Sequence, residues 1–450
     1  MNIAYTAYKF LSTSLFLLLF PPFWFYSRIT GRYSQSISQR IGLYPDRLVR
    51  TISGSPRIWI HAVSVGEVSS AIAIIKSLKA LMPDCAVILS TTTEHGQAFA
   101  KNKLSAHEHR PLATCIYAPV DFILSARKAL SILKPDVLVC LETEIWPNWL
   151  VEAQRLGIKT ALVNGRISVR TIKGYLKIRP LMKAILNLVD AFSMINKADA
   201  HRIEMIGAPG KRIEINGNAK YDLLLNQTDA KIKAKMESIY NIKGDKPVFV
   251  AGSTRRSEEK IILDVYGRII KSFPETLLIL APRHVERVHH IKKLVKNQGF
   301  ACQLKSDLDE QNCLRTAPIV IVDTIGELMN TYSIASIVFC GGSLVPLGGQ
   351  NILEAAVWGK PVFYGPSMED FLDAKDLLDK TGGGIQVKDG QELTEKAIYY
   401  LANPDKAVAV GKLAAQAVMS HKGAADKHAD VIYRLLNYSS MSPALLLQEH

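Results

Sequence analysis

Three groups of ionisable side chains directly follow short apolar runs, where they could take part in chemistry. Glu67 closes S-V-G-E after the run RIWIHAV, Glu142 and Glu144 follow VLVCL, and Lys220 lies in GNAKYD. A glutamate at the start of a helix is stabilised in its charged form and can act as a general base. A lysine in such a place can neutralise negative charge that develops on a substrate. Ordinary helix capping explains Glu67 equally well when the motif is taken alone.

A second set of segments in the C-terminal half has the residue types of a nucleotide site. Ser253 lies in AGSTRRSEE, a glycine and serine turn into a helix that can hold a phosphate. Arg283 in APRH can bind a phosphate in bidentate fashion, and GGS at 341–343 adds another glycine turn. The candidate nucleotide-binding residues are Ser253, Pro282, Arg283, Ile325, Gly326, Glu327, Asn351, Ile352, Leu353 and Glu354.

Several function classes are disfavoured. The sequence contains no Walker A lysine motif and no G-x-G-x-x-G, which argues against an NTPase or a dehydrogenase. No D-x-D or H-x-x-x-H pair stands out as a metal site, so we expect no metal and no cofactor. The six cysteines are scattered without a C-x-x-C, as expected for free thiols in a reducing compartment.

The charge balance narrows the choice of partner. Fifty-five Lys and Arg against 41 Asp and Glu give a net charge of +14, which favours an anionic membrane surface or a phosphorylated substrate. Nucleic acid is the weaker choice, because no zinc finger or aromatic RNA-binding strand is present. The basic residues of RISVRTIKGYLKIRPLMK (166–183) could meet lipid phosphates or simply form a solvated helix face.

Strand-like and helical segments alternate along most of the chain, which predicts an α/β protein with parallel sheets. A charged helical stretch near 226–246 separates two such series. We therefore expect two Rossmann-like domains facing across a cleft, with ligands at the carboxyl ends of the strands. The predicted division is 1–30 a membrane anchor, 31–225 an N-terminal acceptor domain, 226–246 a connection, 247–430 a C-terminal donor domain and 431–450 a tail.

The N-terminal segment is predicted to attach the chain to a membrane. No charged residue lies between Phe10 and Tyr26, Pro21 and Pro22 interrupt this run, and Arg28 and Arg32 follow it. The run is at the short limit for a spanning helix, so a short span and an interfacial helix both remain open. Arginines after the segment place the following domain on the cytoplasmic side.

Taken in order, SVGE, ETEIWPN, GNAKYD, APRH, DTIGEL, GGS and GGQNILEA resemble the 3-deoxy-D-manno-octulosonic acid (Kdo) transferases of lipopolysaccharide biosynthesis. The resemblance covers nearly the whole chain. It implies a GT-B fold and inverting transfer of Kdo from CMP-Kdo to the lipid A precursor (lipid IVA). It also implies that this occurs at the cytoplasmic face of the inner membrane.

The resemblance also implies roles for single residues. Glu67 matches the proton acceptor, and Glu142 and Lys220 match positions that stabilise the transition state. The segments around Arg283, Glu327 and Glu354 match those that contact CMP. Gln350 and Ile352 replace a His and a Pro that the family often has. Two alternatives remain open: a GT-B enzyme using a UDP-sugar, and a non-catalytic membrane-surface protein that binds nucleotides or lipids.

Overall fold

The computed structural model describes residues 3–31, 36–104, 111–225, 228–309 and 313–437. The chain divides into two compact units, each described by itself. The first comprises Met1–Leu223 together with His421–His450, and the second comprises Leu224–Ser420.

The first unit is built on a parallel sheet of seven strands. Their order across the sheet is β3 (Thr114–Tyr117), β2 (Ala86–Thr91), β1 (Arg57–His61), β4 (Val137–Leu141), β5 (Lys159–Gly165), β6 (Ala191–Met194) and β7 (Ile213–Ile215). The central strands are buried on both faces, as expected when helices cover both sides of a parallel sheet. The strand order reverses between β1 and β4, where His61 pairs in register with Cys140. This reversal is a topological switch point, where ligands of such folds bind.

The second unit has the same architecture. Its order is β10 (Cys302–Leu304), β11 (Ile319–Ile321), β9 (Leu277–Pro282), β8 (Val248–Thr254), β12 (Ile337–Cys340), β13 (Val362–Tyr364) and β14 (Gly384–Gln386), all parallel. Its switch point lies between β8 and β12. The prediction of an α/β chain with two Rossmann-like units is therefore confirmed.

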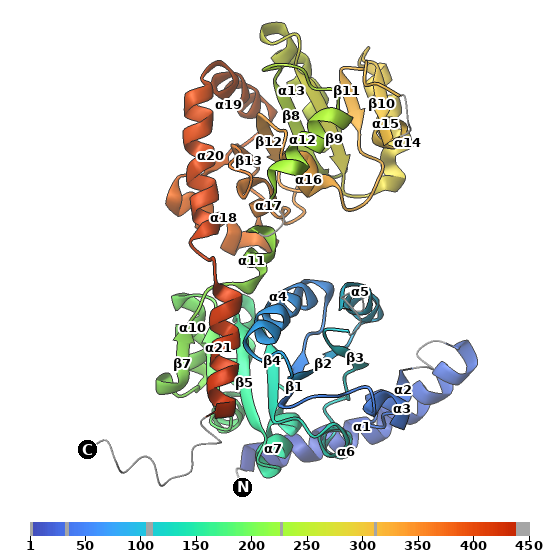
Figure 1. Ribbon diagram of the computed structural model, residues 1–450, viewed down its shortest axis with the longest axis vertical. Coiled ribbons are helices and arrows are strands. Elements are labelled where there is room, and N and C mark those ends of the chain that lie inside the picture. The colour runs from blue at the N-terminus through green and yellow to red at the C-terminus, as the bar shows by residue number, and fades with distance from the viewer. Residues whose placement is uncertain (1–2, 32–35, 105–110, 226–227, 310–312, 438–450) are drawn as a thin grey trace. The chain divides into compact units, whose positions relative to one another are not determined.

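Helices connect the strands in both units (Figure 1). The first unit contains α1 (Ile3–Thr30), α2 (Ile37–Arg40), α3 (Asp46–Val49), α4 (Val65–Leu81), α5 (Glu94–Leu104), α6 (Ile123–Leu133), α7 (Pro147–Arg155), α8 (Val169–Lys177), α9 (Arg179–Leu186), α10 (Lys197–Ile206), η1 (Gly210–Arg212) and α21 (Ala424–Asn437), and α11 (Ala219–Leu225) crosses its boundary. The second unit contains α12 (Ala230–Ile239), α13 (Glu258–Ser272), η2 (Val285–Arg287), α14 (Val288–Asn297), α15 (Lys305–Asp309), α16 (Leu328–Tyr332), α17 (Leu353–Ala356), η3 (Glu369–Phe371), α18 (Leu372–Thr381), α19 (Gly390–Ala402) and α20 (Pro404–Met419).

The structure differs from the predicted domain boundaries at the C-terminal end. Helix α21 packs on the first unit (Figure 1), and Ala425, Ala429 and Ile432 are buried in its core. Asp222 fixes the start of the helix, because its carboxylate accepts the backbone N–H groups of Gly423 (2.8 Å) and Ala425 (2.6 Å). The predicted boundary at residue 430 falls inside this helix. The predicted connection at 226–246 likewise contains α12, which belongs to the second unit.

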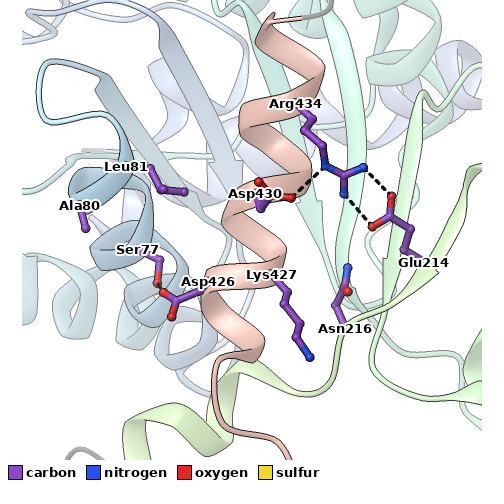
Figure 2. A pocket seen from close by; sticks show the side chains of 9 residues that line it. All are labelled: Ser77, Ala80, Leu81, Glu214, Asn216, Asp426, Lys427, Asp430 and Arg434. Carbon is purple, nitrogen blue, oxygen red and sulfur yellow. Dashed lines mark hydrogen bonds and ion pairs between the residues drawn. The ribbon is translucent and has the colours of Figure 1, made fainter.

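A polar pocket of about 450 Å³ flanks α21 (Figure 2). Arg434 forms a bidentate ion pair with Glu214 of β7, with N–O distances of 2.9 and 2.7 Å, and Ser77 of α4 donates to Asp426 at 2.6 Å. These contacts tie α21 to both neighbouring elements. The pocket contains none of the site residues predicted from the sequence.

We expect His428 to make the docking of α21 sensitive to acid. The ring is fully buried, with Nδ1 2.6 Å from Ser193 Oγ and Nε2 3.0 Å from the Gly217 carbonyl oxygen. Burial lowers the pKa of His428 from 6.5 to about 4. Between these values the unfolded chain binds a proton that the folded chain excludes, so stability falls as the pH falls. The expected loss is on the order of 2 kcal/mol.

Thermal unfolding measured from about pH 7 to about pH 5 tests this expectation. His428→Asn should show a shallower loss of stability than the parent chain across this window. His95→Asn, at an exposed histidine of α5, should follow the parent. Parallel curves for His428→Asn and the parent chain would refute the assignment.

Candidate functional site

Glu67 lies at the switch point of the first unit, in the first turn of α4. Its Oε2 accepts the backbone N–H of Val63 at 2.7 Å, and Ser64 Oγ donates to its Oε1 at 3.1 Å. These bonds hold the carboxylate in one place after strand β1. Burial raises the pKa of Glu67. The bond from Val63 opposes the shift, and the negative charge of Glu144 adds to it. A glutamate with a raised pKa is a stronger base than one in water.

Glu142 and Glu144 both follow β4, which pairs with β1. Glu142 has a positive φ of 51°, a backbone conformation that non-glycine residues rarely adopt and that is enriched at functional sites. Glu144 is fixed by Trp146, whose Nε1 donates to Glu144 Oε2 at 2.8 Å. The negative charge of Glu144 acts on Glu67 and raises its pKa.

His61 joins this group, and the sequence analysis did not single it out. It is the last residue of β1 and fully buried. Its Nδ1 lies 2.9 Å from Ser90 Oγ, and its Nε2 lies 3.7 Å from Glu144 Oε2. The signal in the sequence was a histidine after the apolar residues IWI, three positions before the S-V-G-E motif begins.

Asn164 holds the helix that carries Lys220 at the same edge of the sheet. Asn164 is a buried residue of β5 with a positive φ of 51°, and its Oδ1 accepts the backbone N–H of Ala219 at 2.9 Å. This bond fixes the start of α11, where Lys220 is the second residue. Glu67, Glu142 and Asn164 thus lie at or just beyond the ends of three adjacent strands, β1, β4 and β5.

In the second unit, the glycine turn GGS is occupied by the protein's own carboxylate. Glu258 is fully buried and accepts the backbone N–H groups of Gly342 (2.6 Å), Ser343 (3.0 Å) and Leu344 (3.0 Å). It also accepts the N–H of Arg255 at 2.9 Å. The backbone donors of Gly342, Ser343 and Leu344 are therefore already used by a carboxylate of the same unit. Glu258 instead links the end of β12 to the turn after β8.

Ser253 and Arg255 lie at the switch point of this unit. Ser253, part of β8, has a positive φ of 54°, and its side chain is half-buried. The Cδ of Arg255 lies 3.6 Å from the position that a Cβ on Gly342 would take. Its buried Nε has no hydrogen-bond partner within the described residues. An arginine in this state is a candidate anion ligand that the sequence analysis passed over, although it stands two residues after Ser253.

The predicted residues after β9 and β11 are exposed to different degrees. Pro282 ends β9 and is buried, whereas Arg283 is exposed. Ile325 is 86% exposed, unusual for an isoleucine, and Gly326 follows with a φ of 92°. Glu327 is held from two sides: Thr324 Oγ1 donates to it at 2.8 Å, and the fully buried Lys305 lies 3.2 Å away.

In the segment Asn351–Glu354, the two polar side chains contact each other at the start of α17. Asn351 Nδ2 donates to Glu354 Oε1 at 3.1 Å, and Asn351 Oδ1 accepts the backbone N–H of Leu353 at 3.2 Å. Ile352 and Leu353 are buried, at 0% and 1% exposure. Their side chains belong to the core, so only their backbone is placed to meet a ligand. Within the described ranges, no three His, Cys, Asp or Glu side chains are grouped so that they could hold a metal ion.

Comparison with known proteins identifies relatives over most of the chain. Residues 35–223 match the family model described as 3-deoxy-D-manno-octulosonic-acid transferase (kdotransferase). A 3-deoxy-D-manno-octulosonic acid transferase of Haemophilus influenzae is 28% identical over 94% of this chain and 98% of that protein. A probable mitochondrial one of Arabidopsis thaliana is 30% identical over 77% of this chain and 78% of that protein.

Two further matches bear on length and fold. The chain spans about half (52%) of a bifunctional glycosyltransferase/methyltransferase of Fusobacterium nucleatum, with 35% identity over 77% of this chain. A UDP-GlcNAc 2-epimerase structure from Neisseria meningitidis aligns with a TM-score of 0.58 at 13% identity, over 85% of this chain and 100% of that one. At that identity the likeness shows the fold alone, which is the predicted GT-B type. With a transferase relative 30% identical across most of both chains, the protein belongs to the 3-deoxy-D-manno-octulosonic acid (Kdo) transferase family, a family of glycosyltransferases.

Proposed function

We propose that this chain transfers Kdo from CMP-Kdo to a lipid A precursor, lipid IVA, at the cytoplasmic face of the inner membrane. The proposal includes inversion at the anomeric carbon and a mechanism without a metal ion or cofactor. The family membership supports the sugar and the reaction class. The observation that carries the mechanism is Glu67, a half-buried, firmly held carboxylate with a raised pKa at a switch point.

In the proposed mechanism, Glu67 removes the proton from an acceptor hydroxyl. The freed oxygen forms a bond to the anomeric carbon of Kdo, while the bond from that carbon to the CMP phosphate oxygen breaks. CMP leaves with the bonding electrons. Glu142 and Lys220 stabilise the charge of the intervening oxocarbenium-like state. The donor is bound by Ser253, Arg283, the 325–327 turn, Asn351 and Glu354, with Arg255 as a further phosphate ligand.

The direct test combines the purified full chain with CMP-Kdo and lipid IVA and weighs the product. We expect a mass increase by whole Kdo units, no product with UDP-sugars, and an unchanged rate with EDTA. Transfer from a UDP-sugar would replace this proposal with the UDP-sugar alternative. Lipid binding without any CMP release would favour the non-catalytic alternative.

Glu144→Gln should change the pH dependence of transfer. The reaction needs Glu67 ionised, so kcat/KM falls when the pH drops through the pKa of Glu67, which lies above the ordinary range. Glu144 raises the pKa of Glu67 through its like charge, and His61 lowers it, so removing the charge of Glu144 lowers that pKa. The acidic limb of the profile should therefore move to lower pH. Glu94→Gln, in the first turn of α5 after the next strand, is the control for the change in net charge. If Glu144→Gln and Glu94→Gln gave the same pH dependence of kcat/KM, the effect of Glu144 on the pKa of Glu67 would be contradicted.

Arg255→Ala should weaken donor binding more than it slows chemistry. Loss of one charge-assisted contact to a phosphate costs about 1.5–3 kcal/mol, or roughly 10- to 150-fold in the dissociation constant of CMP. Calorimetric titration of CMP measures this. The exposed neighbour Arg256 provides the matched control, since Arg256→Ala should bind CMP as the parent does. Equal affinities for both variants would remove Arg255 from the site.

A further inference from the structure

Helix α1 presents one continuous stripe of side chains to the first unit. Tyr5 donates to Asn148 Oδ1 at 3.1 Å, and Tyr8 donates to Asp121 Oδ2 at 2.7 Å. Asn148 also donates to Ser12 Oγ at 3.3 Å. One turn later, the Phe16 ring stacks on Phe122 with 4.3 Å between the ring centroids. These positions recur every three or four residues, so they share one face of the helix.

Most of the remaining surface of α1 along its uncharged run is apolar and exposed. Outside the stripe, exposed side chains follow one another along the whole uncharged run: Phe10, Leu11, Leu17, Leu18, Trp24 and Phe25. By length and composition alone, α1 could cross a membrane. An exposed apolar surface of this extent marks a site that lipid or a partner covers.

The contacts of the stripe are incompatible with a spanning orientation. A span puts the two ends of the helix on opposite sides of a hydrocarbon layer about 30 Å thick. Tyr5, Tyr8 and Ser12 lie at the N-terminal end of α1, yet they bind Asp121 and Asn148 of the globular unit. Figure 1 shows α1 running alongside α6 and α7; Phe122 precedes α6, and Asn148 lies in the first turn of α7. In a spanning helix these contacts would all be lost, or a carboxylate would enter the bilayer at high cost.

A basic surface adjoins this helix. Helix α9 contacts α1, and Tyr5 and Tyr8 pack in one cluster with Ile172 of α8 and Leu181 of α9. Among residues 171–186, the exposed side chains are basic or apolar: Lys173, Leu176, Lys177, Ile178, Arg179, Pro180 and Lys183. Basic and apolar side chains together suit the headgroup layer of an anionic bilayer.

We infer that α1 lies in the plane of the membrane surface, with its stripe on the first unit and its opposite face in lipid. The exposed residues of α8 and α9 add a basic contact to anionic headgroups beside it. This inference rests on the proposed membrane attachment and deepens it. The partner is the bilayer surface itself, and the helix is an interfacial element that does not cross it.

A cross-linking experiment separates the two orientations. The full chain with Phe16→Cys and Phe122→Cys is treated with a short bismaleimide in inner-membrane vesicles, and bridged peptides are identified by mass. Leu18→Cys with Phe122→Cys is the matched control, because Leu18 is 71% exposed outside the stripe. An in-plane helix gives the first bridge at least about tenfold more often than the control. Ser12→Cys with Asn148→Cys is a second test pair should the stacked pair impair folding.

The absence of both bridges from membrane-bound chain would overturn the inference in favour of a span. The readout needs no activity, so it stays informative even if the proposed transfer reaction proves wrong. Loss of activity with intact cross-links would count against the function alone.

A vesicle experiment tests the partner. Leu18→Glu should lower binding of the full chain to phosphatidylglycerol–phosphatidylethanolamine vesicles by at least about tenfold, because it removes apolar burial and adds a negative charge. Leu314→Glu, at a leucine 67% exposed in the second unit, should bind as the parent does. Equal binding by both variants would mean that lipid does not cover this face of α1.

Discussion

Replacing Glu67 by Gln will lower the rate of Kdo transfer by about 10²–10⁴-fold while leaving the affinity for CMP-Kdo unchanged. The amide cannot take the proton of the acceptor hydroxyl, so the attacking oxygen stays a poor nucleophile. Donor binding is unaffected because the residues proposed to hold the donor belong to the second unit. Single-turnover rates measured with lipid IVA, beside calorimetric titration of CMP, separate the two effects.

The choice of Gln follows from the local hydrogen bonds. The side-chain oxygens of Glu67 accept from Val63 N and Ser64 Oγ, so Glu67→Ala also removes a helix cap worth about 1 kcal/mol. Gln keeps an acceptor for Val63 and tests the proton transfer alone. Glu94→Gln, in the corresponding turn after β2, should transfer Kdo at the parent rate. A Glu67→Gln chain with near-parental turnover would end the assignment of this residue as the base.

The architecture and the place of Glu67 could be predicted because both depend on local patterns. Apolar runs of strand length ended where polar, glycine-containing segments began, and parallel strands bring such ends to one edge. Glu144 therefore lies close enough to Glu67 to raise its pKa, although the two residues are far apart in the chain. The same local argument could not decide between Glu142 and Glu144. That distinction depends on the positive φ of Glu142 and on the hydrogen bond from Trp146 to Glu144.

What the sequence could not provide were contacts between distant segments. The glycine turn at 341–343 has the composition of a phosphate cradle, but a carboxylate 84 positions earlier takes its first donor. The N-terminal helix reads equally as a span or an interfacial helix until Tyr8 is found on Asp121, 113 positions away. Similarly, the sequence analysis assigned residues up to 430 to the donor domain, whereas α21 packs on the first unit and is capped there by Asp222. The residue types of a segment indicate what it can bind, whereas the fold shows which group of the protein already binds it.

Glu258→Ala should destabilise the second unit by several kcal/mol, because each buried donor left without its acceptor costs about 1–3 kcal/mol. The substitution leaves four backbone N–H groups, those of Arg255 and Gly342–Leu344, without their acceptor in a buried site. It also frees the turn after β12 from the turn after β8, so affinity for CMP should fall together with stability. Urea unfolding followed by tryptophan fluorescence, combined with CMP titration below the transition, measures both losses.

The isosteric variant distinguishes a charge requirement from a packing requirement. Glu258→Gln preserves the volume and one acceptor oxygen but turns an NH₂ group toward backbone donors, so it should lose a large part of the same stability. Glu286→Ala removes an exposed carboxylate of the same unit and should unfold with the parent chain. If Glu258→Ala also unfolded at the same urea concentration as the parent, the four backbone N–H groups would be hydrogen-bonded to water. The site would then be open to solvent. In that case the backbone N–H groups of the GGS turn would be available to a phosphate. Glu258 would then no longer be assigned as the acceptor that satisfies them.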